Sequence, residues 1–373
     1  MANYDLLLKG GRLIDPAAGL DGKRDVAIAA SHIAAVGEDL SASNADRVVD
    51  VSGKIVLPGL VDFHTHAYWG VCEYGVDPDT TFLPTGVTTV LDVGSAGVHT
   101  LPGLRRYVIE PSQTRIFALL HVNTIGMTHT VGELLTDQYV NPEVTAAVAK
   151  ENSDIVVGIK VRLSRKVAGE ADWQAFMAAR KAADMASMPL MVHFGDSATP
   201  LSRVLAKMGQ GDILTHCFSG RRNNIMGEDR RLLPAVWDAA RRGVIFDVGH
   251  GMGSFNFDVA HAALEQGFVP TTISSDLHAF SLPHPAISLL TTMTKFVELG
   301  LPLADVVERA TVVPARLLGQ EGKIGTLQPG AEADVAVVRE LEGEFRLWDA
   351  DGNSRVARRF LSPFLTLRAG RPY

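Results

Sequence analysis

Short apolar runs alternate with longer stretches of helical spacing through the middle of this chain. Most of the short runs are almost continuously apolar, as expected for parallel strands that are covered on both faces. We predict eight strands, at 59–66, 88–94, 115–122, 155–163, 189–195, 212–218, 244–249 and 271–276. Stretches rich in alanine and charge, with the period of an amphipathic helix, lie at 142–150, 170–186, 199–208, 229–241 and 256–266.

Eight strands separated by helices over about 250 residues are typical of a (β/α)8 TIM barrel. A doubly wound sheet would alternate in the same way, but it would carry a glycine-rich fingerprint after its first strand. That fingerprint is missing after 59–66. We therefore predict an α/β chain whose barrel domain spans residues 56–319.

The two ends of the chain have a different pattern from the middle. Strand-like segments broken by glycine turns lie at 4–9, 11–14, 25–36, 324–339 and 344–348. Each end is too short to fold as a domain, whereas the two ends of a chain often lie close together. We therefore predict one small β-sandwich domain made from residues 1–55 and 320–373.

Composition narrows the class of protein. The 373 residues include 35 Lys and Arg against 42 Asp and Glu, a net charge of −7, which argues against nucleic-acid or membrane partners. Two cysteines, Cys72 and Cys217, cannot form a disulfide framework and favour a reducing compartment. No signal peptide or apolar run of about 18 residues is visible. We expect a cytoplasmic enzyme, monomeric or homo-oligomeric, with a small-molecule substrate.

Histidines at the ends of the predicted strands point to chemistry. The first strand ends in His64 and His66, which project from the same face because strand residues alternate in direction. At the carboxyl end of a barrel strand they would face the active-site mouth. Two imidazoles there suit Zn²⁺ or a similar ion, although such a pair can also be incidental.

The other strands carry four more residues that fit the same chemistry. His193, His216 and Asp276 lie near the ends of their strands, and Lys160 lies in the apolar run 155–163. A protonated lysine has no lone pair for a metal, but an apolar, cation-rich site favours the neutral amine. That amine can add CO₂ to form a carbamate able to bridge two metal ions. Pairing of Lys160 with a carboxylate, or a role as a catalytic amine, fits the sequence equally well.

These residues resemble the amidohydrolase superfamily of metal-dependent hydrolases. The resemblance rests on the run Val56–His66, on the tail 323–337 and on the polar residues at the strand ends, which are Lys160, His193, His216 and Asp276. It covers essentially the whole chain. Within the superfamily the sequence is most similar to the dihydroorotase-like amidohydrolase/deacetylase group.

The resemblance implies a site with two divalent metal ions. His64, His66 and Asp276 would hold one ion, while His193 and His216 would hold the other. A CO₂-derived carbamate on Lys160 and a hydroxide would bridge them. Zn²⁺ is the expected metal, with Mn²⁺ or Fe²⁺ as alternatives. The hydroxide would attack a carbonyl, and catalytic Asp276 would take its proton and return it to the leaving group.

Two positions separate this chain from better-known relatives. Dihydroorotase-type enzymes place an arginine two residues after the histidine pair, where this chain has Tyr68. D-aminoacylases use a cysteine ligand on the second or third strand, whereas Cys72 lies in the loop after the first strand. We interpret Cys72 as an ordinary loop residue, with metal contact as the alternative, and Cys217 as a packing residue.

Three residues are candidates for substrate binding. Arg162 shares a strand face with Lys160 and would bind a carboxylate with two hydrogen bonds, unless it pairs with a loop acid. His278 follows Asp276 by two residues and would either contact substrate or cap the next loop. Gly253 lies in the glycine-rich segment 249–255, which allows close backbone approach to a ligand or forms a tight turn. Asp62, deeper on the first strand, would orient the ligand histidines.

The leading hypothesis is hydrolysis of an amide or ester bond in a small acylated acid. N-acetyl amino acids and acetylated 2-hydroxy acids are the substrate classes that the resemblance implies. A cyclic amide hydrolase of dihydroorotase or dihydropyrimidinase type is the alternative enzyme. A non-catalytic scaffold is disfavoured because the sequence keeps all six metal-ligand positions.

Overall fold

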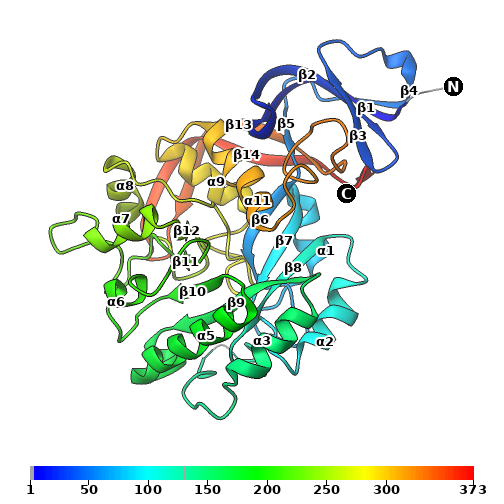
Figure 1. The fold of residues 1–373 in the computed structure, drawn as a ribbon. Helices are drawn as coiled ribbons and strands as arrows, with labels where there is room; N and C mark the ends of the chain where they lie inside the picture. The colour runs from blue at the N-terminus through cyan, green and yellow to red at the C-terminus, as the bar shows by residue number, and fades with distance from the viewer. Residues whose placement is uncertain (1–3, 130) are drawn as a thin grey trace.

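Two sheets organise the molecule, a curled parallel sheet in the middle of the chain and a separate sheet at its ends (Figure 1). The computed structural model describes residues 4–129 and 131–373. The parallel sheet has the strand order β12-β11-β10-β9-β8-β7-β6, which is the order of the sequence. Its strands are β6 (Leu60–Thr65), β7 (Val87–Val93), β8 (Arg115–His121), β9 (Val156–Leu163), β10 (Leu190–Phe194), β11 (Ile213–Thr215) and β12 (Ile245–Asp247).

The eighth predicted strand, 271–276, is not a regular strand, yet it closes the barrel. Isolated parallel bridges join Thr272 to Asp247 of β12 and Leu277 to Thr65 of β6. The backbone N–H of Ser275 donates to a carboxylate oxygen of Asp62 at 2.9 Å. The Asp62 side chain thus accepts a hydrogen bond that a backbone carbonyl of the neighbouring strand would accept in a regular ladder. This exchange explains why the segment lies in the barrel wall without continuous pairing.

Helices follow the strands where the sequence predicted them, with shorter bounds in four of the five cases. The five predicted helices are α3 (Pro142–Glu151), α5 (Asp172–Ala186), α6 (Leu201–Leu205), α7 (Pro234–Arg241) and α8 (Phe257–Glu265). Helix α7 begins at Pro234 rather than at 229, because proline suits the first helical position and lacks the N–H needed further in.

Further helices were not predicted. They are α1 (Pro78–Thr81), α2 (Leu101–Leu104), α4 (Arg165–Ala168), α9 (Leu289–Glu298), α10 (Leu303–Glu308) and α11 (Val312–Leu317). Short 3₁₀ turns lie at η1 (Pro16–Ala18), η2 (Ala42–Asn44), η3 (Leu83–Thr85) and η5 (Gly169–Ala171), and a π turn lies at η4 (Arg105–Ile109).

Both ends of the chain build one eight-stranded sheet. Its order is β15-β14-β13-β5-β1-β2-β3, with β4 paired to β1. The strands are β1 (Tyr4–Asp15), β2 (Leu20–Ala29), β3 (His32–Gly37), β4 (Ala45–Asp50), β5 (Ile55–Pro58), β13 (Val335–Trp348), β14 (Ser354–Arg368) and β15 (Arg371–Pro372). Strand β5 pairs with both β1 and β13, so it joins the N-terminal and C-terminal segments.

The long hairpin β13–β14 reaches from the end sheet onto the barrel (Figure 1). Its distal residues Leu347, Ala357 and Leu361 are buried in the same apolar cluster as the barrel helices. The backbone N–H of Leu361 donates to Oγ1 of Thr294 on α9 at 3.2 Å. The domain boundary at residue 320 stays a prediction, since this hairpin packs against both parts.

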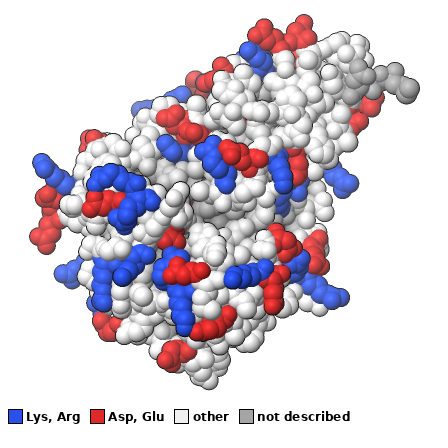
Figure 2. Space-filling view, in the orientation of Figure 1, with Lys and Arg blue, Asp and Glu red and all other residues white. Residues whose placement is uncertain are grey.

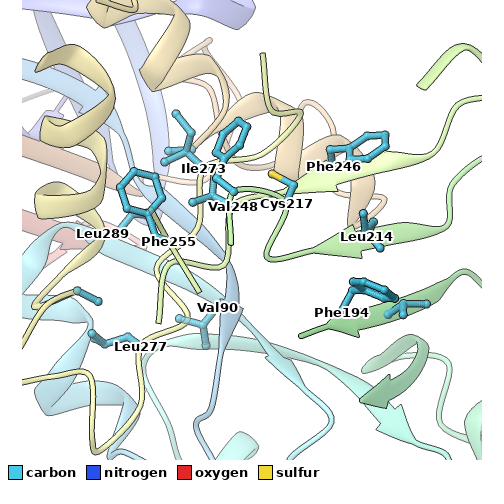
Figure 3. Close-up of a cluster of buried hydrophobic side chains, with 14 of the residues drawn as sticks. Val90, Phe194, Leu214, Cys217, Phe246, Val248, Phe255, Ile273, Leu277 and Leu289 are labelled. Carbon is cyan, nitrogen blue, oxygen red and sulfur yellow. The ribbon is translucent and has the colours of Figure 1, made fainter. Parts of the chain in front are cut away.

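Apolar side chains fill the space between the barrel strands and the outer helices. Figure 3 shows part of this cluster, including Val90, Phe194 and Phe246. Cys217 is 1% exposed and belongs to the same cluster, in agreement with a packing role. On the visible surface, positive and negative side chains are interspersed (Figure 2). None of the helices in the described residues has the length and apolar content that a bilayer crossing requires.

Candidate active site

A cavity of about 1000 Å³ opens beyond the carboxyl ends of the barrel strands, where active sites of this fold lie. Four of the six predicted metal ligands line it, namely His66, Lys160, His193 and Asp276. They come from four separate parts of the barrel wall. The barrel therefore brings together side chains that lie up to 210 residues apart in the sequence.

His64, His66 and Asp276 form a compact buried group. Each offers one ligand atom, and these atoms all lie within 4.8 Å of one another. Oδ1 of Asp276 lies 3.3 Å from Nε2 of His64 and 3.5 Å from Nε2 of His66. Burial lowers the pKa of His66 to about 3, so its imidazole is neutral. The group therefore presents neutral nitrogens and a carboxylate, the ligands that Zn²⁺ uses.

A buried hydrogen-bond network fixes the ring of His64. Asp247 at the end of β12 accepts a hydrogen bond from the Thr215 hydroxyl at 2.7 Å. Nδ1 of His64 lies 2.8 Å from the Thr215 oxygen and 3.2 Å from the Asp247 carboxylate. Because that carboxylate accepts, Nδ1 of His64 carries the proton. The lone pair of His64 is therefore on Nε2, which faces Asp276.

His193 and His216 form a second pair beside this group. Nε2 of His216 lies 2.8 Å from Nδ1 of His193, and the rings of His216 and His64 are 5.0 Å apart. Nδ1 of His216 lies 2.7 Å from the carbonyl oxygen of Gly249. A carbonyl only accepts, so Nδ1 is protonated and the lone pair of His216 lies on Nε2.

Lys160 is buried close to both groups, near enough for its charge to act on His64, His193 and His216. Its side chain is 1% exposed, and Nζ contacts Sδ of Met191 at 3.4 Å. Within the described residues it forms no ion pair, so the sequence alternative of a structural carboxylate partner is wrong. Burial lowers the pKa of Lys160 to about 7. Gly94 leaves room for this side chain, since a Cβ there would lie 2.7 Å from Cγ of Lys160.

Two of the predicted ligands have strained backbones. His216 and Asp276 have φ values of +65° and +46°, a region that costs a residue with a side chain about 1–3 kcal/mol. Such strain persists where the surrounding structure imposes it, and it is concentrated at functional sites. Burial also raises the pKa of Asp276, which makes it a better proton acceptor than an exposed aspartate.

Arg162 lines the cavity and also forms the salt bridge that the sequence left as its alternative. Nη1 of Arg162 lies 3.0 Å from Oε1 of Glu133, and both side chains are buried. Its guanidinium also lies 3.4 Å from the Tyr74 hydroxyl and 5.4 Å from the centre of that ring. A guanidinium has five donors in one plane, so pairing with Glu133 is compatible with a further contact to a substrate carboxylate.

The other two predicted substrate residues also reach the cavity. His278 is 4% exposed, and its ring lies 4.9 Å from that of Tyr74. Its Nδ1 accepts a hydrogen bond from the N–H of Phe280 at 3.2 Å, so it also shapes the loop. Gly253 lines the cavity, and its carbonyl accepts from Nε of Arg221 at 3.3 Å. Their contact with substrate stays a prediction.

Tyr68 and Cys72 are buried away from the cavity walls. The Tyr68 hydroxyl donates to the carbonyl of Thr100 at 3.0 Å, and the side chain packs in the core. Burial raises the pKa of the Cys72 thiol to about 12, which disfavours the thiolate that binds metals. Neither residue is among those that line the cavity in the described structure.

Sequence reasoning misjudged or missed several supporting residues. Asp62 holds the N–H and hydroxyl of Ser275 instead of a histidine ring, so it fixes the segment before Asp276. Asp247 takes the role expected of Asp62, and it also accepts from Thr272 and Ser274 at 2.6 Å. An aspartate inside the apolar run 244–249 was the available signal for Asp247. Glu133, in a long loop, offered none.

Basic side chains outnumber acidic ones around the cavity. Apart from Lys160, the basic residues that line it are Arg162, Arg165, Lys166, Arg221 and Arg222. Apart from Asp276, the acidic ones are Asp196 and Asp351. Since the whole chain has a net charge of −7, this local excess of positive charge is a property of the cavity. It favours anionic ligands.

Comparison with known proteins agrees with this geometry. A model of the amidohydrolase family matches residues 55–353. A deacetylase of Agrobacterium fabrum is 34% identical over 333 residues, which cover 89% of this chain and 82% of that protein. A deacetylase of Enterococcus faecalis is 33% identical over 374 residues, covering 100% of this chain and 99% of that protein.

Solved structures of similar sequence show the same family relationship. A crystal structure of an adenine deaminase is 32% identical with a TM-score of 0.91 and covers 100% of both chains. A crystal structure of a dihydroorotase is 32% identical with a TM-score of 0.90 and covers 98% of this chain and 97% of that one. These neighbours share the TIM-barrel architecture, which confirms the predicted fold class. The chain therefore belongs to the amidohydrolase family of hydrolytic enzymes.

Proposed function

We propose that this protein is a metal-dependent deacetylase that hydrolyses an amide or ester bond in a small acylated acid. N-acetyl amino acids and acetylated 2-hydroxy acids are the substrate classes. The observation that carries the proposal is the cluster of ligand-type side chains in a cavity where basic side chains outnumber acidic ones. Two relatives named deacetylase, which match most of their length, support acetyl as the group that is removed.

The donor set fits two divalent ions. Three lone-pair donors converge in the first group, with Oδ1 of Asp276 3.3 Å from Nε2 of His64. Two lone pairs and a carboxylate oxygen repel one another unless a cation lies among them. We propose that His64, His66 and Asp276 hold one ion and that His193 and His216 hold the other. Zn²⁺ suits these ligands best, with Mn²⁺ or Fe²⁺ as alternatives.

Lys160 would complete this centre as a carbamate. Its neutral amine attacks CO₂, forming an N–C bond and releasing one proton to solvent, and the product is an anion with two oxygens. Burial, which lowers the pKa of Lys160 to about 7, supplies the neutral amine that this addition needs. The apolar contact with Met191 and the absence of an ion pair within the described residues support this role.

Asp276 would move the proton during hydrolysis. Bound divalent ions lower the pKa of water and polarise a substrate carbonyl. Burial raises the pKa of Asp276, so its carboxylate can accept the proton of the attacking water and donate it to the leaving amine or alkoxide. The hydrogen bonds that Ser275 donates to the Asp62 carboxylate would hold the backbone just before Asp276 and keep the Asp276 carboxylate in place.

Arg162 would orient the acid group of the substrate. It lies on the same strand face as Lys160, two residues further along β9, and it lines the cavity. Its pairing with Glu133 holds the guanidinium in one orientation. The exposed basic residues further out, such as Arg221 and Arg222, would attract anionic substrates toward the mouth.

Hydrolysis of a cyclic amide is the alternative activity, because a dihydroorotase structure is 32% identical over nearly the whole chain. Tyr68 weighs against it. The position at which dihydroorotase-type enzymes carry an arginine holds a tyrosine that is buried in the core and bonded to Thr100. Among the arginines that line the cavity, Arg162 is the buried one. It lies on β9, whereas Tyr68 follows β6.

One panel of substrates tests the proposal. Protein with Zn²⁺ is assayed with N-acetyl-D- and N-acetyl-L-amino acids, acetylated 2-hydroxy acids, dihydroorotate, hydantoin and adenine. We expect turnover of at least one acetylated acid, loss of turnover on chelation, and close to two ions per chain by elemental analysis. Arg162→Met should raise KM for the acid and leave neutral acetyl esters unaffected. Turnover confined to cyclic amides or adenine would overturn the deacetylase proposal.

A further inference from the structure

A buried lysine–histidine pair lies behind the active-site wall. Lys295 on α9 and His250 in the glycine-rich segment 249–255 are both 0% exposed. Nζ of Lys295 lies 2.7 Å from Nε2 of His250 and donates to the carbonyl of Pro285 at 3.0 Å. Neither residue lines the cavity or belongs to the proposed metal centre.

The hydrogen bonds of this pair have a fixed direction. Nδ1 of His250 lies 2.9 Å from the carbonyl of Gly251, and a carbonyl only accepts. His250 therefore donates from Nδ1 and accepts at Nε2, which makes Lys295 the donor. A lysine amine has at least two protons in either charge state, so it satisfies both His250 and Pro285.

The segment held by His250 touches the site directly. The carbonyl of Gly249 accepts the hydrogen bond from Nδ1 of His216 at 2.7 Å. The N–H of Gly251 donates to the carbonyl of Ser275 at 2.9 Å, and a Cβ at Gly251 would overlap the Asp276 carboxylate. Movement of this segment would therefore shift His216 and Asp276 together.

Pro285 lies in a second segment that contacts Asp276, since the Ser281 hydroxyl of that segment donates to the Asp276 carbonyl at 3.1 Å. It belongs to the segment 278–288, which follows Asp276 and contains the cavity residue His278. Lys295 thus joins two segments that both contact Asp276, one after β12 and one after the closing segment 271–276. Phe255, in the first of these segments, packs with its ring 4.6 Å from His250 in the apolar cluster of Figure 3.

Stability alone does not account for a lysine at this place. Within the described residues no carboxylate forms an ion pair with Lys295, and burial lowers its pKa to about 7. A buried amine without a carboxylate partner costs stability, and an apolar side chain of similar shape would avoid that cost. The amine must therefore supply something that an apolar side chain cannot, which is two directed hydrogen bonds.

We propose that Lys295 is a positioning residue, whose amine ties segment 249–255 to segment 278–288 and so holds His216 and Asp276 in place. The inference rests on the proposed metal centre, since it concerns two of its ligands. Lys295 acts through His250 and Pro285 and touches no reacting atom.

Lys295→Met tests this role, because methionine keeps most of the apolar stem and removes the amine. Zn²⁺ binding is measured by competition with a chromophoric chelator, alongside kcat, KM and the unfolding midpoint. We expect the weaker Zn²⁺ affinity to fall about 10-fold or more, the size of effect seen when a residue that orients a metal ligand is lost. The kcat for an acetylated acid should fall similarly, with KM little changed.

Met293→Ala is the matched control. Met293 is 0% exposed on the same helix, so its truncation opens a cavity and destabilises α9 without removing a hydrogen bond. It should lower the unfolding midpoint and leave Zn²⁺ affinity unchanged. Equal Zn²⁺ affinity in wild type and Lys295→Met, or equal losses in Lys295→Met and Met293→Ala, would overturn the positioning role. A wild-type protein that binds no Zn²⁺ would overturn the proposed function as well.

Variants of His250 test the same link if Lys295→Met does not fold. His250→Gln keeps a side-chain oxygen that accepts from Lys295, whereas His250→Phe keeps the aromatic packing against Phe255 and accepts nothing. We expect His250→Gln to keep Zn²⁺ affinity within about 3-fold of wild type and His250→Phe to lose about 10-fold or more. Equal affinity in the two variants would contradict the proposal.

Discussion

Two buried polar regions lie at opposite ends of the barrel, and they are built differently. At the amino ends of the strands, Arg115 of β8 and Arg368 of β14 surround Glu332 and Asp334, which precede β13. Asp334 lies 2.8 Å from Arg115 and 3.2 Å from Arg368. This cluster joins the barrel to the end sheet. Every charge in it faces an opposite charge.

The carboxyl ends of the strands hold the opposite arrangement. There the buried groups are imidazoles with lone pairs, an aspartate among them, and Lys160 beside a thioether. Burial raises the pKa of Asp276 and lowers that of Lys160, because neither charge is fully compensated. His216 and Asp276 also have strained backbones, whereas Arg115, Glu332, Asp334 and Arg368 do not.

The difference separates a structural cluster from a chemical one. Paired charges hold two sheets together and have little left to offer a ligand. Uncompensated donors cost stability but can bind cations and move protons. Substitutions at the active-site end should therefore remove activity and leave stability nearly intact. Substitutions in the charged cluster between the barrel and the end sheet, here called the junction, should lower stability and leave activity nearly intact.

Lys160→Ala should give the largest effect. Loss of the bridging anion should remove one of the two metal ions and reduce kcat by several orders of magnitude, with a normal unfolding midpoint. Elemental analysis and steady-state kinetics measure both, with the exposed Lys207→Ala as control. A short carboxylic acid added to the buffer should partly restore metal content. Normal metal content and rate in Lys160→Ala would contradict the carbamate.

Asp276→Asn should reduce kcat by at least about 10²-fold while KM changes little, because general acid–base catalysis contributes about 10²–10⁴-fold. Asparagine keeps the shape and one oxygen but cannot accept the proton. Asp196→Asn, also at the cavity wall, is the matched control and should keep its kcat. Near-normal kcat in Asp276→Asn would move the proton transfer elsewhere, with His278 the first residue to test.

Asp334→Asn should show the reverse behaviour at the junction. Removing one charge from a largely buried pair costs about 3 kcal/mol of unfolding free energy, because Arg115 and Arg368 are only 14% and 18% exposed. The kcat of the folded protein should not change. Glu344→Ala removes an exposed ion pair with Arg358 and should cost under about 1 kcal/mol. A loss of kcat in Asp334→Asn would break the distinction between the regions.

The pH dependence of stability gives a last test, at the Lys295–His250 pair behind the active-site wall. Burial lowers the pKa of Lys295 to about 7, whereas the unfolded chain keeps its value near 10.5. Between these values the unfolded state binds one more proton, so stability rises with pH. The unfolding free energy of the wild type minus that of Lys295→Met should increase by up to about 1.4 kcal/mol per pH unit from pH 7 to 10. Both proteins are measured in the presence of a chelator, so that metal binding does not contribute. His250, Asp349 and His284, the titratable groups around the amine, are common to both proteins.

A pH-independent difference would show that Lys295 keeps its proton in the folded protein. The junction offers the contrast, because arginine does not lose its proton in proteins. The difference between wild type and Asp334→Asn should therefore stay flat over the same range.

Local pattern in the sequence determined the architecture and the chemistry of the site. Apolar runs of strand length, separated by helical stretches, predicted the barrel, and the ends of those runs located His64, His66, His193 and His216. Both signals are local, since a strand alternates every second residue and a barrel directs all its carboxyl ends to one side.

Tertiary structure alone decided the parts that depend on distant partners. The sequence did not predict that 271–276 closes the barrel through single bridges, that Asp247 orients His64, or that Glu133 pairs with Arg162. Helix α9 was not predicted, so Lys295 could not be linked to His250, 45 residues away. Residues that bind metal carry their chemistry in their type and position, whereas residues that orient them are defined by what they touch, and contacts exist only once the chain has folded.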